Sequence, residues 1–376
     1  MNILYDHQIF IDQSYGGPSR YFFNIIEEIK KKENLKISAP IHINQYLSKL
    51  PRDLVHGYNI NYLMSENIPF RIRKIIRNKF IDKINLFYWK KSIKNFKPDI
   101  IHKTYYDNYE KIKIPTVLTV YDLIHEKYHE LYRKKKDYRP KEKAINNADK
   151  IICISQNTKN DLIQYYDVDK KKIEVIYLAS NINKKEALLS RDTEKIPFKD
   201  FLLFVGKRWG YKNFENLIKV YANSNQLKKD FKIVCFGGGE FSKIELDLFK
   251  DNNLDANNLI QINGDDSQLL YLYRKASAFI FPSIIEGFGL PPLEAMSQSC
   301  PVISSNHSAI IEGVGDAAET FDPLDVGDIA QKINNVLYNR TYADTLIKKG
   351  IDRSKLFSWE KCASETLNVY KKIQSR

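Results

Sequence analysis

The sequence has 376 residues, of which 43% are hydrophobic and 28% charged, and its 59 Lys and Arg against 46 Asp and Glu give a formal net charge of +13. At about 150 residues per domain, this length predicts two or three domains, and the composition is ordinary for a globular protein, so disorder is not the default expectation. The sequence has no apolar run long enough to span a membrane, no leader peptide, and no CxxC pair among its cysteines, Cys153, Cys235, Cys300 and Cys362. We therefore expect a cytoplasmic protein with buried, reduced thiols and no cysteine-based metal site.

The chain opens with a predicted strand at residues 2–5, a loop that contains Gly16 and Gly17, and an amphipathic helix that ends near Lys31. Two glycines just before a helix allow the backbone to approach a ligand closely. The loop is not a GxGxxG fingerprint, so a simple strand-to-helix turn explains it equally well.

The segment 70–97 is strongly basic, with ten Lys and Arg against one acid, Asp82. Its apolar residues recur at helical spacing, which is typical of a helix that lies on an anionic membrane surface. The basic residues that we expect at the membrane are Arg71, Arg73, Lys74, Arg77, Lys79 and Lys83. The alternative is a helix that packs on its own domain and exposes its basic face to solvent.

Two series of predicted strands alternate with helices, which favours two doubly wound parallel sheets of the α/β class. The first series continues with residues 37–39, 99–103, 116–121, 150–155 and 174–178, and the second comprises 201–205, 232–236, 259–262, 278–281 and 301–304. The polar tract 181–197 between them reads as a linker, and residues 359–372 read as a final helix. Because ligands bind beyond the carboxyl ends of parallel strands, the loops there favour a two-substrate enzyme.

The stretch 278–305 reads as strand, glycine loop, helix and strand, with the helix opening at Pro291 and Pro292. Glu286 lies in the loop and Glu294 is expected in the first helical turn. A helix N-terminus offers unpaired N–H groups and a partial positive charge, so a phosphate or a polyol attached to one is the expected ligand. A glycosidase-type acid and base pair is the alternative role for the two carboxylates.

Two cations follow the strand 201–205, Arg208 and Lys212. Each cation at about 4 Å from an anion contributes on the order of 4 kcal/mol at an effective dielectric of 20, so the pair suits a departing diphosphate. The sequence contains no P-loop and no Gly-x-Ser-x-Gly motif.

Two metal motifs compete with this interpretation. His125-Glu126-Lys127-Tyr128-His129 matches the HExxH pattern of zinc hydrolases, but His125 directly follows a predicted strand. Asp167 and Asp169 spell DxD, but they lie in a polar connector. We expect no metal at either place.

Over nearly its whole length the chain resembles glycosyltransferase family 4, the retaining GT-B transferases, and in particular the mannosyltransferase-like group. EGFGLPPLE at 286–294 is similar to the family's Glu-x7-Glu signature. Other matching segments, in family order around it, are the Gly-Gly loop, TVYD, ADKIICIS, GKRWGYKNF, PVISS, EGVGDAA, FDP and FSWEK. The resemblance implies an acceptor-binding domain at 1–185, a nucleotide-sugar domain at 195–355 facing it across a cleft, and a helix at 356–376 that packs on the first domain.

The resemblance also implies a role for each matching residue. Glu294 would bind the ribose of the donor, Arg208 and Lys212 would neutralise the leaving diphosphate, and Glu286 would hold the donor sugar. The remaining donor-binding residues would be Gly16, Gly17, Gly287, Phe288, Gly289 and Leu290. His125 is a candidate catalytic residue, but the chain has Tyr121 where many relatives have His, so Tyr121, Asp122 and His125 all stay open for the position against the sugar.

The implied activity is retaining, metal-independent transfer of a hexose, without a cofactor, from a nucleotide diphosphate sugar. GDP-mannose is favoured as the donor and a UDP-hexose comes next. The acceptor would be lipid-linked or a polysaccharide, at the inner face of the membrane, as in lipopolysaccharide synthesis. Alternatives are a nucleotide-sugar epimerase, a soluble sugar synthase or, remotely, a zinc hydrolase; no nucleic-acid-binding module is present.

Overall fold

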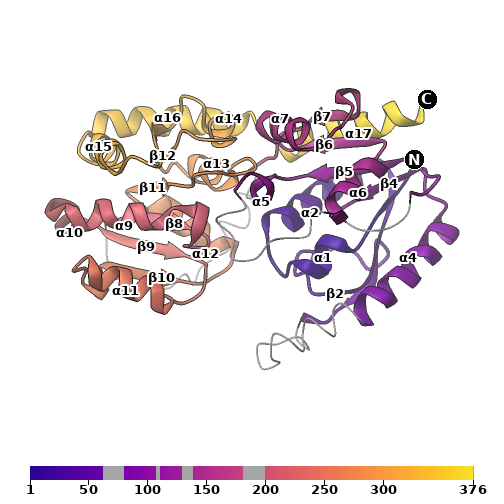
Figure 1. Ribbon diagram of the computed structural model, residues 1–376, viewed down its shortest axis with the longest axis horizontal. Helices are drawn as coiled ribbons and strands as arrows, with labels where there is room; N and C mark the ends of the chain where they lie inside the picture. Colours follow the sequence, from indigo (N-terminus) through magenta and orange to yellow (C-terminus); the bar gives the residue numbers. More distant parts are fainter. Residues whose placement is uncertain (62–79, 107–110, 129–138, 181–199, 376) are drawn as a thin grey trace. The chain divides into compact units, whose positions relative to one another are not determined.

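The computed structural model describes residues 1–61, 80–106, 111–128, 139–180 and 200–375, and these residues form two compact units (Figure 1). Unit 1 comprises the described parts of 1–122, 139–178 and 359–375. Unit 2 comprises 123–128, 179–180 and 200–358. The predicted linker, 181–197, lies outside the described residues.

Unit 1 is built on a seven-stranded sheet in the order β3-β2-β1-β4-β5-β6-β7, in which every pairing is parallel. The strands are β1 (Asn2–Tyr5), β2 (Asn34–His42), β3 (Val55–Asn59), β4 (Ile100–Lys103), β5 (Thr116–Val120), β6 (Lys150–Cys153) and β7 (Ile173–Val175). The central strands are buried on both faces, which explains their continuous apolar runs. The strand order reverses between β1 and β4, so the topological switch point of unit 1 lies there.

Strand β3 was not predicted, because its sequence contains a glycine and lacks apolar alternation. Its partner β2 is longer than the predicted 37–39, and the β2–β3 register shifts between Ser38 and Ile41. Pro40, which has no N–H to donate, lies in this irregularity. Gly57 faces it, and a Cβ at Gly57 would lie 1.8 Å from the carbonyl oxygen of Ala39, so the strands can approach here only with glycine.

Helices cover both faces of the sheet of unit 1 (Figure 1). They are α1 (Gln8–Asp12), α2 (Gly17–Ile29), α4 (Asp82–Phe96), α6 (Arg139–Asn147), α7 (Gln156–Tyr165) and α17 (Trp359–Gln374). Trp89 of α4 is buried against Leu4 and Ile101 of the sheet. The final helix α17, two residues longer than predicted at its C-terminal end, packs against α2 and β6.

A buried polar network joins α17 to the sheet of unit 1. The hydroxyl of Tyr370 lies 2.6 Å from Nδ1 of His102 and 3.1 Å from the hydroxyl of Tyr5. Nε2 of His102 lies 2.8 Å from Oγ1 of Thr119. Burial lowers the pKa of His102 to about 3, so this histidine is neutral in the folded protein.

Unit 2 contains a six-stranded parallel sheet in the order β10-β9-β8-β11-β12-β13. The strands are β8 (Phe201–Val205), β9 (Lys232–Phe236), β10 (Leu259–Ile262), β11 (Ala278–Phe281), β12 (Val302–Ser305) and β13 (Glu319–Phe321). The first four have the predicted bounds, whereas the three-residue β13 was not predicted. The order reverses between β8 and β11, which places the switch point of unit 2 there.

The helices of unit 2 lie on both faces of its sheet (Figure 1). They are α5 (Ile124–Lys127), α9 (Phe214–Asn223), α10 (Asn225–Asp230), α11 (Lys243–Asp251), α12 (Asp266–Lys275), α13 (Leu290–Ser297), α14 (Ile310–Val314), α15 (Val326–Leu337) and α16 (Arg340–Lys355). A core of buried side chains from α9, α15 and the strands includes Phe204, Phe214 and Ile333. Two doubly wound parallel α/β sheets confirm the predicted fold class.

All four cysteines are buried free thiols, as expected from their spacing. Burial raises the pKa of Cys153 and of Cys235 to about 12, so neither is a reactive thiolate. Across the described residues, no helix combines the length and the apolarity that crossing a bilayer requires.

Candidate functional site

The loops that follow β8 and β11 meet at the switch point of unit 2. The backbone N–H of Ile284, after β11, donates to the carbonyl of Tyr211, after β8, at 2.8 Å. The side-chain amide of Asn213 donates to the carbonyl of Pro282 at 3.1 Å and to that of Pro323, after β13, at 2.7 Å. Three strand-end loops are therefore fastened together by hydrogen bonds that no local sequence pattern predicts.

Two predicted site residues form an ion pair across this switch point. Nζ of Lys212 lies 2.6 Å from Oε1 of Glu286, and the two side chains are only 17% and 13% exposed. The ammonium also lies 5.5 Å from the ring centre of Phe281 and 5.4 Å from that of Tyr211. Aromatic walls exclude water, which strengthens the attraction of this cation for any anion that reaches it.

The backbone of Glu286 is held by Ser308, which lies in the loop after β12. The N–H of Glu286 donates to Oγ of Ser308 at 3.2 Å, and the hydroxyl of Ser308 donates to the carbonyl of Glu286 at 2.8 Å. Ser308 has a φ of 59°, a left-handed conformation that is uncommon for serine. Sequence reasoning missed Ser308, because a serine in a loop carries no signal of its own.

The glycine loop leads directly into α13. Gly289 has a φ of 98° and is the N-cap residue, so α13 begins at Leu290, ahead of the two prolines. Phe288 is buried and packs edge-on against Phe357, with ring centres 5.5 Å apart. The loop of Gly287, Phe288 and Gly289 is therefore anchored by one aromatic side chain and turned by one glycine.

Glu294 lies one residue deeper in α13 than predicted, which moves it from the first turn into the second. The helix begins at Leu290, so Glu294 is its fifth residue and falls in the second turn. Its side chain is buried, and the hydroxyl of Tyr273 donates to Oε2 at 3.4 Å. A buried carboxylate with a hydroxyl neighbour can accept hydrogen bonds from a ligand hydroxyl at low desolvation cost.

Arg208 is oriented away from solvent and clamps a neighbouring loop. Its Nε donates to Oε1 of Glu245 at 2.5 Å, and its Nη atoms donate to the carbonyls of Gly237 and Gly239 at 2.8 Å and of Glu240 at 3.1 Å. The guanidinium also lies 4.8 Å from the ring centre of Phe241. Arg208 thus fixes the turn after β9, a structural role that the sequence did not reveal.

The clamped turn needs glycine at three consecutive positions. Gly237, Gly238 and Gly239 each have a φ of 77°. A Cβ at Gly238 would lie 2.8 Å from Nη1 of Arg208 and from the carbonyl oxygen of Gly206, whereas one at Gly239 would meet no atom within 4 Å. The close packing of Arg208 on this turn therefore depends on Gly238.

Glu245 completes the clamp from α11. It forms a capping box with Ser242, whose N–H donates to Oε2 at 2.7 Å. Burial alone would raise the pKa of Glu245, but hydrogen bonds from Ser242 and the adjacent Arg208 lower it below its ordinary value. The carboxylate is therefore charged at neutral pH and balances the buried guanidinium.

The predicted residues of unit 1 lie in the segments that follow β1 and β5. Gly17 begins α2 after the N-cap residue Gly16, and a Cβ at Gly17 would meet no atom within 4 Å. Asp6, which was not predicted, follows β1 and accepts the backbone N–H of Thr104 at 2.9 Å. The hydroxyl of Tyr121 is buried and donates to the carbonyl of Thr104 at 3.1 Å.

The other sequence candidates are dispersed. Asp122 lies two residues after β5 in unit 1, whereas His125 lies on α5 in unit 2. Helix α5 ends at Lys127, and His129 of the HExxH pattern is outside the described residues. Asp169 caps a short turn by accepting the N–H of Lys171 at 2.9 Å. Within the described ranges, no three His, Cys, Asp or Glu residues group as metal ligands do.

Of the predicted membrane-facing residues, Lys83 lies exposed on α4. The other five, Arg71, Arg73, Lys74, Arg77 and Lys79, lie outside the described residues. The described part of α4 combines features of a helix packed on its own domain and of a membrane-surface helix. Trp89 packs on the sheet, whereas the apolar side chain of Phe87 is 66% exposed.

Two family profiles cover most of the chain. Residues 15–183 match "Glycosyltransferase Family 4" and residues 187–353 match "Glycosyl transferases group 1". Among curated proteins, the chain is 28% identical over 255 residues to O-antigen chain mannosyltransferase B of Escherichia coli, which covers 62% of this chain and 66% of that protein. It is also 28% identical over 310 residues to the serotype-specific mannosyltransferase WbdA of Escherichia coli, covering 75% of this chain and 38% of that protein.

Solved structures agree on the fold. Sucrose-phosphate synthase from Thermosynechococcus elongatus superimposes with a TM-score of 0.75 at 18% identity, covering 100% of this chain and 99% of that one. At this identity the likeness speaks for the architecture alone.

Proposed function

This chain belongs to glycosyltransferase family 4, and from that premise we propose that it moves a hexose from a nucleotide diphosphate sugar to a lipid-linked or polysaccharide acceptor. We favour GDP-mannose as the donor, because the two curated relatives are named mannosyltransferases, and a UDP-hexose comes next. The product would be a cell-surface glycan of the O-antigen or lipopolysaccharide type, made at the inner face of the membrane.

The observation that carries this proposal is the ion pair between Lys212 and Glu286 at the switch point of unit 2. A diphosphate brings negative charge that competes with Glu286 for the ammonium of Lys212. Once Lys212 turns to the phosphates, the carboxylate of Glu286 is available to accept hydrogen bonds from the hydroxyls of the donor sugar. One ion pair thus prepares both halves of the donor site.

The rest of the donor site follows from α13. The N–H groups of its first turn, entered through Gly289, can bind a phosphate oxygen. Glu294, buried in the second turn, would accept from the ribose hydroxyls. We propose that the leaving diphosphate is neutralised by Lys212, with Arg208 holding the adjacent turn and adding its charge, and without a metal ion. The sugar would keep its anomeric configuration.

The first experiment measures nucleotide diphosphate release from a panel of GDP-, UDP- and dTDP-sugars, with and without lipid-linked acceptors. We expect release from one donor class in the presence of an acceptor, and proton NMR of the product should show a retained anomeric configuration. If no donor in the panel releases nucleotide diphosphate, the proposal is wrong. Interconversion of a free nucleotide sugar without acceptor would instead identify an epimerase.

A second experiment tests the ribose contact. Glu294→Gln keeps the shape of the side chain and removes its charge, so donor affinity should fall roughly tenfold to a hundredfold, as for other hydrogen bonds to charged groups. The matched control is Glu215→Gln, since Glu215 is an exposed residue of α9 that forms an ion pair with Lys219 one turn along the same helix. Equal donor affinity in both variants, measured by calorimetry, would remove Glu294 from the site.

A further inference from the structure

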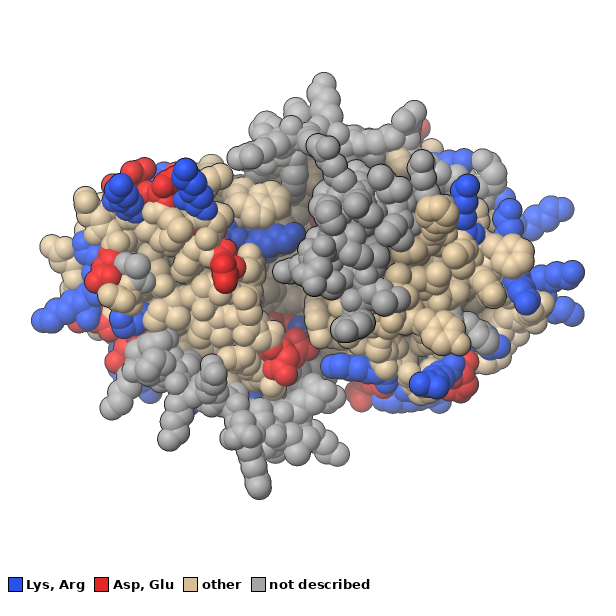
Figure 2. All heavy atoms as spheres, turned by 90° about the horizontal axis from the view of Figure 1, so that it is seen from below, with Lys and Arg blue, Asp and Glu red and all other residues tan. Residues whose placement is uncertain are grey.

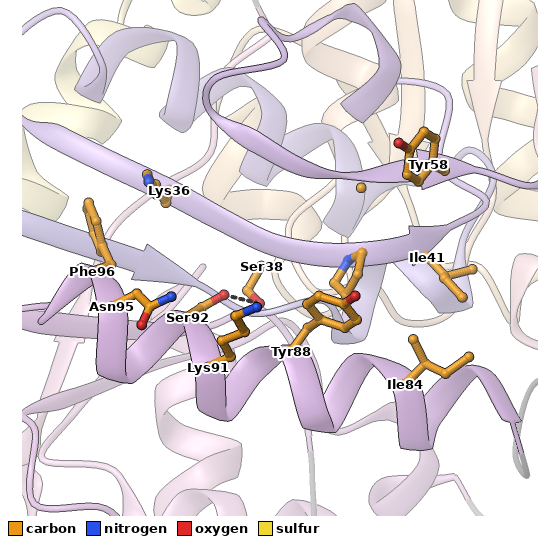
Figure 3. A pocket seen from close by; sticks show the side chains of 12 residues that line it. Lys36, Ser38, Ile41, Tyr58, Ile84, Tyr88, Lys91, Ser92, Asn95 and Phe96 are labelled. Carbon is orange, nitrogen blue, oxygen red and sulfur yellow. Dashed lines mark hydrogen bonds between the residues drawn. The ribbon is translucent and has the colours of Figure 1, made fainter.

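Unit 1 contains a groove that is not part of the switch-point chemistry. It has a volume of about 670 Å³ and runs between helix α4 and the strands β2 and β3 (Figure 3). Its size falls within the range of roughly 300–1,000 Å³ that is usual for small-molecule sites. It is lined by Lys36, Ser38, Pro40, Ile41, Gly57, Tyr58, Ile84, Tyr88, Lys91, Ser92, Asn95 and Phe96.

The sequence builds this groove from two periodicities. Lys36, Ser38 and Pro40 alternate along β2 and share one face of the strand. On α4, Ile84, Tyr88, Lys91 and Asn95 follow one another at steps of three and four residues, and therefore form one stripe of the helix.

Hydrogen bonds fix the helix at a set distance from the strand. The hydroxyls of Ser38 and Ser92 lie 3.0 Å apart, as the dashed line in Figure 3 marks. Asn85, buried on α4, accepts the N–H of Ile41 at 2.9 Å and donates to its carbonyl at 3.0 Å. Gly57 adds no side chain to the groove. The groove is thus a built feature of the sheet edge.

The walls of the groove are apolar and open to solvent. Tyr58 on β3 is 80% exposed, and Ile84 and Tyr88 on α4 are also exposed. Phe87 extends this apolar surface beyond the groove, because its exposed ring lies with its centre 5.5 Å from that of Tyr88. Contiguous exposed apolar side chains mark a surface that is covered by a partner.

The charged groups that line the groove are two cations, Lys36 and Lys91, beside the neutral polar side chains of Ser38, Ser92 and Asn95. Nζ of Lys36 lies 5.4 Å from the ring centre of Phe96, and Nζ of Lys91 lies 5.9 Å from that of Tyr88. Among the ion pairs of the described residues, neither lysine is paired with a carboxylate. The exposed lysines Lys90 and Lys94 add charge on the same helix. Figure 2 shows such blue side chains interspersed with tan ones on the part of unit 1 that carries α4.

We propose that this groove binds one anionic phospholipid of a membrane, with an acyl chain between Tyr58, Ile84 and Tyr88 and the phosphate at Lys36 and Lys91. A small soluble anion would leave the aromatic walls uncovered, and a neutral apolar ligand would bury two unpaired ammonium groups. An amphiphile with one negative head group both covers the aromatic walls and pairs with the ammonium groups. Proteins that bind anionic lipids commonly present a basic surface beside an apolar one. The inference goes beyond the proposed glycosyl transfer and does not depend on it.

The test uses dihexanoylphosphatidylglycerol below its micelle concentration, so that single lipid molecules are offered to the whole protein in a calorimeter. We expect saturable binding, and clearly weaker binding of dihexanoylphosphatidylcholine and of glycerol phosphate. Lys36→Gln with Lys91→Gln should weaken binding about thirtyfold, from two lost contacts to an anionic head. The matched control, Lys90→Gln with Lys94→Gln, removes the same charge from α4 outside the groove and should change affinity less than about threefold.

Equal losses in the two double variants would mean that the lipid is attracted only by the general charge of α4, and the groove proposal would be wrong. No saturable binding of monomeric phosphatidylglycerol, or saturable binding of an acidic peptide that the lipid does not displace, would also overturn it. Tyr58→Ser, at a highly exposed position, tests the contact with the acyl chain and should also weaken binding of the anionic lipid. Nucleotide diphosphate release without lipid, measured on the same variants, should stay unchanged. The two assays therefore distinguish a wrong lipid-binding proposal from a wrong glycosyl-transfer proposal.

Discussion

The carboxyl edge of the sheet in unit 2 carries two ion pairs, whereas a network of neutral side chains joins the final helix of unit 1 to its sheet. In unit 2, Lys212 pairs with Glu286 and Arg208 with Glu245. In unit 1, the hydroxyl of Tyr370 and the neutral ring of His102 occupy the centre. Two sheets with the same winding thus serve different purposes. Unit 2 places paired charges beside its switch point, whereas unit 1 fastens its last helix to the sheet with a buried neutral network.

The largest effect should come from breaking the buried clamp. Arg208→Leu leaves Glu245 partly buried without its cation, so the free energy of unfolding of unit 2 should fall by about 3–5 kcal/mol. Urea denaturation followed by hydrogen exchange of peptides from β9 and α11 would measure this. Arg340→Leu is the control, because its pair with Asp344 is exposed. A loss below about 1 kcal/mol would mean that the clamp is not structural.

Lys212→Ala should mainly reduce the rate of transfer. Removing one cation from a water-poor site costs on the order of 4 kcal/mol of transition-state stabilisation, which is nearly a thousandfold in rate. Nucleotide diphosphate release under saturating donor measures the change. Lys219→Ala removes an equal charge from an exposed pair on α9 and should leave the rate within about twofold. Similar rates for both variants would contradict a site at the switch point.

Acid should weaken unit 1 at a higher pH than it weakens unit 2. Burial lowers the pKa of His102 to about 3 and those of His7 and His42 to about 4, whereas a histidine in the unfolded chain has the ordinary pKa of about 6.5. Between these values the unfolded chain binds protons that the folded chain refuses, so the stability of unit 1 is full above pH 6.5 and falls as pH drops. The lowered pKa of Glu245 makes its contribution to unit 2 disappear only below about pH 4.5.

Hydrogen exchange at pH 7 and pH 5, corrected for intrinsic rates, should therefore show a loss of protection in β4 and β5 that is larger than in β8 and β11. The expected loss is on the order of a few kcal/mol. His102→Gln, which can still contact Tyr370, should reduce the pH dependence of unit 1. Equal loss in both sheets would show that the histidines do not set the acid limit.

The smallest expected losses of stability come from alanine substitutions at two neighbouring glycines of unit 2, Gly238 and Gly239. Gly238→Ala adds a Cβ that meets Arg208 and a carbonyl at 2.8 Å, in addition to an unfavourable φ, and should cost about 2–3 kcal/mol. Gly239→Ala has the same φ but open space, so only about 1–2 kcal/mol should be lost. Thermal unfolding compares the two. Identical losses would mean that the strain of the turn, and not its contact with Arg208, decides the requirement for glycine.

The sequence was most informative where a motif is local. The strands of unit 2 are short apolar runs bounded by turns, and four of them were predicted residue by residue. The strands β3 and β13 were missed, because β3 contains Gly57 and β13 is only three residues long. Periodicity identifies a strand only when it is long enough to show alternation or an apolar run.

Pairings between distant residues could not be predicted in this way. Arg208 and Lys212 were both expected to meet phosphate, yet the structure gives Arg208 four hydrogen bonds to the loop after β9 and its adjoining helix. Ser308 holds the backbone of Glu286 across 22 residues of sequence. Such partners are set by which strand ends adjoin in the sheet, and that order follows from tertiary packing.

Helix α17 belongs to unit 1 but lies at the end of the sequence, and this position affects the order in which the two units can fold during translation. Residues 1–178 leave the ribosome before residues 200–358, which form most of unit 2, but the helix that carries Tyr370 follows roughly 180 residues later. At about 5–20 residues per second, the nascent first sheet waits on the order of 10–40 seconds for its last helix. During that time His102 and Tyr5 lack their partner hydroxyl, so unit 2 has the opportunity to fold first, and the earliest-made sheet is the last to be finished.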